Sequence, residues 1–232
     1  MVHYKRLFYF DLETTTDYKD FDDFKKQNPV GAKTFELKHH RAKINGDNYW
    51  QGTVEESYIN RAPLLGDYGK IIVISYGFFK GDEFLISSKT ISDFNSEKEF
   101  MLFIARLLNR AEQRNFVLSG HNIKRFDIPF IFKKMLKYSI KIPNIINFHN
   151  KKPWEMILED TGELTKANAF TYSSLADVTY LLGISTPKND IDGSDVHRVY
   201  WEDNDIERIK KYCEKDVIAV KEIAKRLSEC LN

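Results

Sequence analysis

The first half of the chain contains short apolar runs separated by turn residues, a pattern typical of strands. Residues 6–12 are apolar on both alternating faces, as in a central strand covered by helices on each side. The turn at residues 80–82 separates two later runs and predicts a hairpin between them. The five predicted strands are residues 6–12, 70–79, 83–87, 116–118 and a segment near 154–158.

The second half contains apolar residues at helical spacing. After Ser96, the residues Phe100, Ile104 and Leu108 recur on one helical face. The predicted helices are one that opens at residues 96–99, then 128–138, 172–182 and 204–231. Strands followed by crossover helices predict an α/β fold, in which a mixed five-stranded sheet is flanked by helices.

Residues 16–62 lie between the first two predicted strands and lack strand periodicity. They are too many for a plain connection, and segments 20–26 and 54–60 are predicted to be helical. Tyr49 and Trp50 in this stretch either pack it down or stack on a nucleic-acid base. We therefore expect a single domain over residues 1–232 with an insertion at about 16–62.

Composition limits the partners and the compartment. The chain has 232 residues, and 42% hydrophobic content suffices for one sizeable core. A net charge of +1 excludes a broad basic field, so any contact with a polyanion must be local. Cys213 and Cys230 offer neither a disulfide framework nor zinc-ligand spacing. The N-terminal apolar run is too short for a signal or a membrane span, which predicts a soluble, cytoplasmic protein with no membrane partner.

Two carboxylates, Asp11 and Glu13, lie at i and i+2 near the end of the first predicted strand. The strand period places both on one face. Carboxylates this close repel one another, which is tolerable mainly when a cation lies between them. Taken alone, the pair also fits solvated acids at the end of a strand.

Two further motifs follow along the chain. Asp127 comes after the polar turn 119–122 and opens a predicted helix, where an N-cap role is the ordinary expectation. Tyr212 and Asp216 are four residues apart on the last helix and are therefore neighbours at the margin of its apolar stripe. A solvated Asp beside a half-buried Tyr is the ordinary alternative there.

Together and in this order, the three motifs resemble those of the DEDD exonucleases of the RNase H-like fold. The Tyr-x-x-x-Asp form of the third motif is similar to the branch (DEDDy) that contains the proofreading domains of family B DNA polymerases. The chain also resembles stand-alone predicted 3'-5' exonucleases related to those domains. The resemblance includes residues 68–75, 151–155 and 190–196, and residues 16–62 match only loosely.

The resemblance implies a role for each matching residue. The metal-binding acids would be Asp11, Glu13, Asp127 and Asp216, and Tyr212 would orient the attacking water. Substrate contacts are implied for Thr14 near the 3' end, Asn122 near the terminal nucleotide and Lys188 at the scissile phosphate.

The implied chemistry suits these side chains. Two cations roughly 3.5 to 4 Å apart activate water and stabilise the charge that accumulates on a phosphodiester during hydrolysis. Oxygen ligands suit Mg²⁺ or Mn²⁺. Tyr212, with a reference pKa of about 10, is a poor general base at neutral pH, so we expect it to position water by hydrogen bonding.

The sequence thus predicts a metal-dependent 3'-5' exonuclease, with single-stranded DNA as the expected substrate and a polymerase or another replication or repair protein as a candidate partner. Two alternatives stay open. One is an exoribonuclease of the same superfamily, because a metal site contacts phosphate and not sugar. The other is a catalytically silent nucleic-acid-binding or polymerase accessory module.

Other polar residues are given structural roles. Asp160 and Asp177 follow apolar segments and are predicted to cap helices or form turns. The basic pairs 124–125 and 133–134 either guide a strand or are simply solvated. Five histidines lack paired ligand spacing and are predicted to lie at the surface or in loops: His3, His39, His40, His121 and His149.

Overall fold

The computed structural model of the chain describes residues 2–149, 151–152, 155–167, 169–185 and 190–231. Its centre is a five-stranded sheet in the order β3-β2-β1-β4-β5. β2 is antiparallel to both of its neighbours, β3 and β1, whereas β4 runs parallel to β1 and β5 parallel to β4. The strands are β1 (Leu7–Thr16), β2 (Gly69–Lys80), β3 (Glu83–Thr90), β4 (Val117–Gly120) and β5 (Leu158–Asp160).

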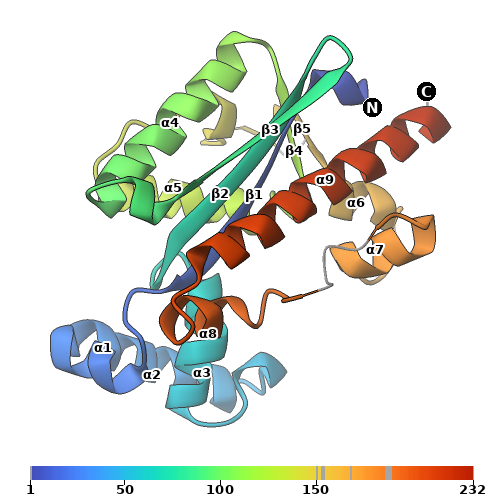
Figure 1. The fold of residues 1–232 in the computed structure, drawn as a ribbon. Coiled ribbons are helices and arrows are strands. Elements are labelled where there is room, and N and C mark those ends of the chain that lie inside the picture. Colours follow the sequence, from blue (N-terminus) through green and yellow to red (C-terminus); the bar gives the residue numbers. More distant parts are fainter. Residues whose placement is uncertain (1, 150, 153–154, 168, 186–189, 232) are drawn as a thin grey trace.

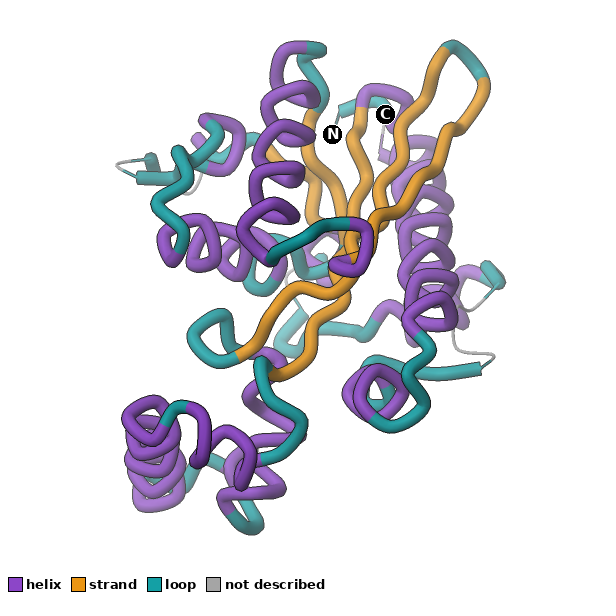
Figure 2. Tube along the Cα trace, turned by 60° about the vertical axis from the view of Figure 1, so that its left-hand side comes forward, coloured by secondary structure: helices purple, strands orange, loops and turns teal. Residues whose placement is uncertain are grey.

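Helices cover both faces of this sheet (Figures 1 and 2). The helices after β3 are α4 (Glu97–Gln113), α5 (Asp127–Lys137), α6 (Thr161–Lys166), α7 (Leu175–Leu182), α8 (Val196–Trp201) and α9 (Ile206–Leu231). Short 3-10 helices lie at Tyr4–Arg6, Ile91–Asp93 and Asn144–Ile146. The predicted mixed α/β sheet flanked by helices is confirmed.

β1 is the buried middle strand, and its side chains alternate between two cores. Phe8, Phe10 and Leu12 pack in one cluster with residues of α4 and α5. Leu7 and Tyr9 pack instead against α9. The apolar character of both faces, visible in the sequence, thus reflects a strand covered on each side.

Several predicted boundaries differ from the structure. β1 was expected to end near residue 12 but continues to Thr16, because its pairing with β2 resumes after a bulge beyond Glu13. The helix expected at 172–182 begins at Leu175, since Ser174 and Asp177 form a capping box there. The fifth strand lies at Leu158–Asp160, and part of the expected segment, residues 153–154, lies outside the described residues.

Residues 21–64 form a group of helices beyond one end of the sheet (Figures 1 and 2), here called the helical segment. Its elements are α1 (Phe21–Gln27), α2 (Pro29–Ile44), α3 (Val54–Arg61) and 3-10 helices at Asn48–Trp50 and Ala62–Leu64. The two helices expected at 20–26 and 54–60 are confirmed, whereas α2 was not expected.

The helical segment has an aromatic core of its own. Phe21, Phe24, Phe35 and Tyr58 are buried together with Trp50, while neighbouring Tyr49 is 73% exposed. Trp50 therefore packs the segment down, one of the two roles considered for it.

The expectation of surface histidines is wrong for one residue of the helical segment. His39 is buried inside the segment. Its burial is tolerated because Nδ1 forms a 2.9 Å hydrogen bond with Ser57 Oγ, which gives this polar ring atom a partner.

No helix among the described residues is both long enough and apolar enough to cross a membrane.

Candidate active site

Asp11 and Glu13 continue the face of β1 that points toward α9, because they follow Leu7 and Tyr9 at the strand period. α9 contributes Asp216 from the same side. Cys213, one turn earlier on α9, lies so close to β1 that its thiol donates to Asp11 Oδ2 at 3.3 Å. A strand and a helix far apart in sequence thus bring three carboxylates together.

Asp127 joins these three carboxylates from α5, the helix that follows β4, which is the second strand paired with β1. It is the first residue of α5, and its Oδ1 accepts a 3.1 Å hydrogen bond from Leu12 N of β1. The preceding loop is held by Asp160, whose carboxylate accepts from Asn122 N at 2.7 Å and Lys124 N at 3.0 Å. Asp160 also caps α6, as its predicted cap or turn role requires. The Asp127 side chain therefore orients toward β1 instead of capping its own helix.

All four carboxylates line one cleft with a volume of about 400 Å³. Glu13, Asp127 and Asp216 are each at most 7% exposed, so the acids are recessed and not freely solvated. The helical segment forms one wall through Ile59, Asn60, Pro63 and Leu64. The remaining lining comes from Leu12, Thr14, His121, Phe126, Gly193, Ser194 and His197.

The other residues singled out in the sequence are placed differently. Thr14 lines the acidic cleft, and its hydroxyl donates to Pro63 O at 2.8 Å. Tyr212 is 8% exposed, hydrogen-bonds Asp216 and borders an adjoining hollow of about 260 Å³. Asn122 lines a further hollow beside the cleft. Lys188 lies outside the described residues.

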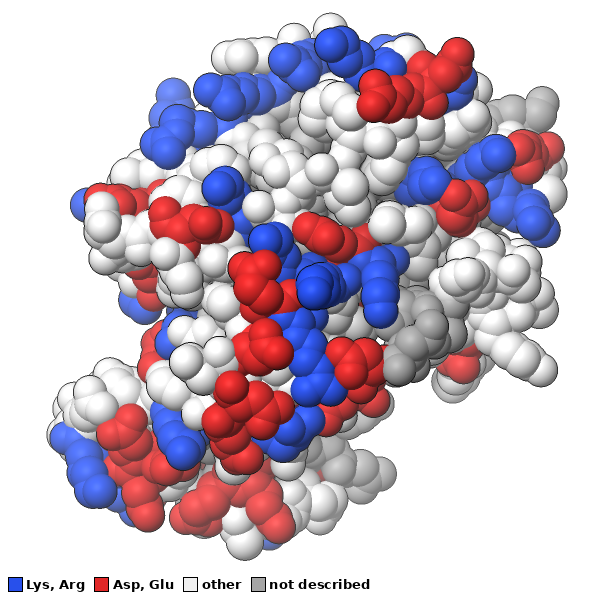
Figure 3. All heavy atoms as spheres, viewed as in Figure 1, with Lys and Arg blue, Asp and Glu red and all other residues white. Residues whose placement is uncertain are grey.

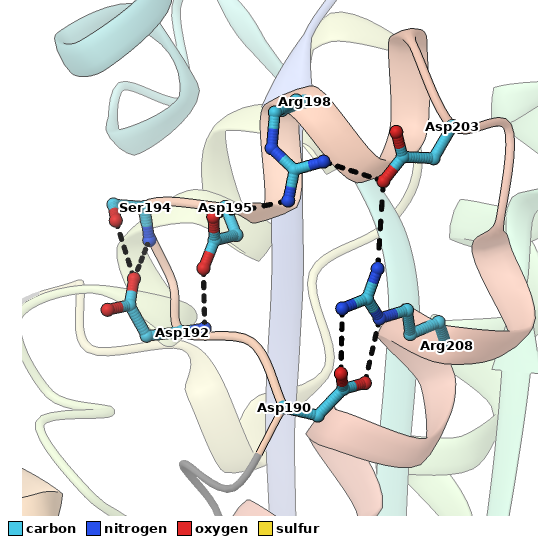
Figure 4. Close-up of polar contacts among 7 residues, drawn as sticks. All are labelled: Asp190, Asp192, Ser194, Asp195, Arg198, Asp203 and Arg208. Carbon is cyan, nitrogen blue, oxygen red and sulfur yellow. Dashed lines mark hydrogen bonds and ion pairs between the residues drawn. The ribbon is translucent and has the colours of Figure 1, made fainter.

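A network of ion pairs holds the cleft wall that contains Gly193 and Ser194 (Figure 4). Arg208 binds Asp190 through two 2.7 Å hydrogen bonds and also contacts Asp203 at 3.6 Å. Asp203 in turn accepts from Arg198 at 2.7 Å. The wall is therefore tied to the start of α9, the helix that carries Asp216.

Burial and mutual repulsion raise the pKa values of Asp11, Glu13 and Asp127. Burial, then the charges of Asp216 and Asp127, raise the pKa of Asp11 well above its usual range. Burial, followed by the negative charge of Asp11, likewise raises the pKa of Glu13 well above its usual range. Burial raises the pKa of Asp127 to about 8, against the hydrogen bond from Leu12. At neutral pH, protons or cations must therefore neutralise part of the cluster.

The pKa of the Tyr212 phenol is also raised, by burial and then by the charge of Asp216. Tyr212 thus keeps its proton at neutral pH and acts as a hydrogen-bond donor.

The donor set fits divalent cations that prefer oxygen ligands. Four carboxylates from β1, α5 and α9 face one open cleft, and a cation among them would relieve the repulsion that raises the pKa values.

Two residues of the site were not anticipated from the sequence. Cys213 was expected only as a reduced thiol, yet it donates to both the carboxylate and the backbone carbonyl of Asp11. His197 lines the cleft, and its Nδ1 lies 3.2 Å from Thr15 Oγ1 and 3.3 Å from Thr16 Oγ1. Because Cys213 follows Tyr212 directly in the sequence, the contact of Cys213 with the site could have been anticipated. Nothing in the local sequence indicates that His197 lines the cleft.

Comparison with known families agrees with this geometry. Residues 61–228 match the family model of the RNase H superfamily. The chain belongs to the RNase H superfamily. For a member of this superfamily, the fold and the acidic cluster indicate a metal-dependent nuclease that acts on nucleic acid. No curated protein matches the chain.

The matched residues of this RNase H superfamily member include Asp127 and Asp216 but not Asp11 and Glu13. The latter two lie in the middle strand of the same sheet, so the structure joins them to the matched part.

The raised pKa values predict how metal-free stability depends on pH. The folded protein retains carboxyl protons that the unfolded chain releases above about pH 4. The free energy of unfolding contributed by these groups therefore falls as pH rises from about 4 to 8. Asp127→Asn should flatten that fall in thermal melts recorded in EDTA between pH 5 and pH 9. Asp22→Asn, at an exposed acid of α1, should leave it unchanged; equal slopes for parent and Asp127→Asn would contradict the assignment.

Proposed function

We propose that this chain is a metal-dependent 3'-5' exonuclease of the DEDDy type that hydrolyses single-stranded DNA, with two Mg²⁺ or Mn²⁺ ions as cofactors. The observation that carries the proposal is the convergence of Asp11, Glu13, Asp127 and Asp216 on one cleft, with Tyr212 hydrogen-bonded to Asp216. Residues 1–232 would form one exonuclease domain, in which the stretch at about 16–62 is an insertion.

Each residue has a role in this proposal. The four carboxylates would hold the cations. When bound, divalent cations lower the pKa of water and stabilise charge on the entering and leaving oxygens of a phosphodiester. The protonated Tyr212 hydroxyl would orient the attacking water from the Asp216 side. Thr14, Asn122 and Lys188 are the proposed substrate-binding residues.

The walls of the cleft favour a strand end as substrate. The helical segment stands on one side and residues 193–197 on another, so the acids are recessed between them. The exposed apolar side chains of Ile59 and Leu64 offer contact surface to an unpaired base. The preference for DNA and the class of partner, a polymerase or another replication or repair protein, rest on the resemblance of the motifs.

A direct assay tests the proposal. A 5'-labelled single strand, as DNA and as RNA, is incubated with Mg²⁺, Mn²⁺ or EDTA. Laddering of DNA from the 3' end with metal supports the proposal. Laddering of RNA alone would assign an exoribonuclease, and binding of either strand without cleavage would assign a silent module.

Replacing a carboxylate should abolish most activity while leaving strand binding largely intact. We expect Asp216→Ala to lower kcat by about 10³-fold, equivalent to the several kcal/mol of charge stabilisation that a bound metal supplies. Glu229→Ala, at an exposed acid on the same helix, is the matched control and should retain full activity. Full activity of Asp216→Ala would refute the assigned role.

Tyr212→Phe should be less damaging than loss of a carboxylate. The ring still packs in its cluster with Ile209 and Cys213, and only the hydroxyl that orients water is lost, which should lower kcat by about 10²-fold. Single-turnover rates with the labelled strand would measure this. A Phe variant as inactive as Asp216→Ala would give the hydroxyl a larger part than orientation.

A further inference from the structure

The acidic cleft cannot hold a nucleic-acid strand by charge. Its described lining includes four carboxylates but no Lys or Arg. Bound cations would neutralise the scissile phosphate, yet every further nucleotide of a strand carries its own negative charge. The chain has a net charge of only +1, and acidic and basic side chains intermix over the middle and lower parts of the face in Figure 3. The strand therefore needs a local positive site next to the cleft.

Such a site adjoins the cleft at His121. A hollow of about 440 Å³ is lined by His121, Asn122, Arg125, Tyr172, Ser173 and Ser174. His121 also lines the acidic cleft, so the two spaces share a wall. The hollow lies between the loop that follows β4 and the segment that precedes α7.

Hydrogen bonds fix both sides of this hollow. His121 bonds Thr161 Oγ1 through Nδ1 at 3.0 Å and Ser173 O through Nε2 at 3.1 Å. Asn122 has a φ of 64°, in the left-handed region, and Asp160 accepts from its backbone N–H. The hollow is therefore preorganised before any ligand binds.

Arg125 lines the hollow, and a second cation, Lys166, lies against the Tyr172 ring that also lines it. The Arg125 guanidinium and the Lys166 ammonium each lie 4.5 Å from the centre of the Tyr172 ring. Neither has a carboxylate within ion-pair distance among the residues that the structure describes. By contrast, neighbouring Lys124 is paired with Glu163 at 2.8 Å. Tyr172 is itself held by a 3.2 Å hydrogen bond to Glu163, and it keeps the two cations in place by cation–π contact.

We infer that this hollow binds the backbone phosphates of the nucleotides that precede the scissile bond, with Arg125 as the principal contact. The inference rests on the proposed function for the direction of the strand: the 3' nucleotide occupies the acidic cleft, and the strand leaves past His121. Arg125 is thus a substrate-binding residue that contacts the preceding phosphates of a strand and does not contact the scissile bond.

Substrates of two lengths separate this role from catalysis. A ten-nucleotide thymidine strand spans both spaces, whereas thymidine 5'-(p-nitrophenyl phosphate) fills only the terminal site and releases p-nitrophenol when its P–O bond is hydrolysed. Arg125→Ala should raise KM for the strand roughly tenfold, as expected for one charged hydrogen bond, and leave the small ester unchanged. The salt dependence of log KM should weaken by about 0.7, the contribution of one phosphate contact.

Three variants complete the test. Tyr172→Ala should resemble Arg125→Ala because the guanidinium loses its support, and Arg125→Lys should restore most of the salt dependence. Arg106→Ala removes an exposed arginine of α4 that lines neither space and should change nothing. Equal losses on both substrates, or unchanged strand kinetics in Arg125→Ala, would overturn the inference.

Strand binding distinguishes this inference from the proposed function. Fluorescence anisotropy of the labelled strand, measured in EDTA, requires no cleavage. If the parent hydrolyses neither substrate, the exonuclease proposal fails, and weaker strand binding by Arg125→Ala would still support the phosphate site. Unchanged binding in that variant would overturn it.

Discussion

The alternation of side chains along β1 determines where the chemistry of this protein lies. β1 is the middle strand, and its even-numbered residues Phe8 to Leu12 fill the core beneath α4 and α5. Its odd-numbered residues face α9, first as the apolar pair Leu7 and Tyr9 and then as Asp11 and Glu13. A shift of one residue in register would exchange these faces and bury the acids in the apolar core.

The same arrangement places like-charged carboxylates close together, and neighbouring hydrogen-bond donors offset part of their repulsion. Carboxylates from β1, α5 and α9 are brought close in a recessed cleft. Burial and mutual repulsion raise the pKa values of Asp11, Glu13 and Asp127. Backbone and thiol donors offset part of the cost: Leu12 N donates to Asp127, and Cys213 donates to Asp11. The ion pairs of Arg208 with Asp190 and Asp203 hold the cleft wall that contains Gly193 and Ser194. Without a metal, the carboxylates of this cluster repel one another, and bound divalent cations would neutralise that repulsion.

Local patterns in the sequence predicted the sheet, the main helices and the position of the acids on their elements. The strand period placed Asp11 and Glu13 together, and the four-residue spacing placed Tyr212 beside Asp216. Contacts between distant segments were not predictable in this way. The thiol of Cys213 contacts Asp11 across 202 residues of sequence, and His197 contacts Thr15 across 182, only because α8 and α9 return to β1. The buried His39 likewise depends on Ser57, which no periodicity links to it.

The central claim is that the four carboxylates together bind divalent cations, and metal-dependent thermal melts of the parent and Asp216→Asn test it most directly. At a hundredfold excess of Mn²⁺ over Kd, binding to the folded state alone should stabilise the parent by about 2.7 kcal/mol. Asp216→Asn removes repulsion at nearly constant shape, so in EDTA it should melt at or above the parent, and it should gain less from Mn²⁺. An EDTA melt of the variant well below the parent, with an equal Mn²⁺ shift in both proteins, would contradict the account.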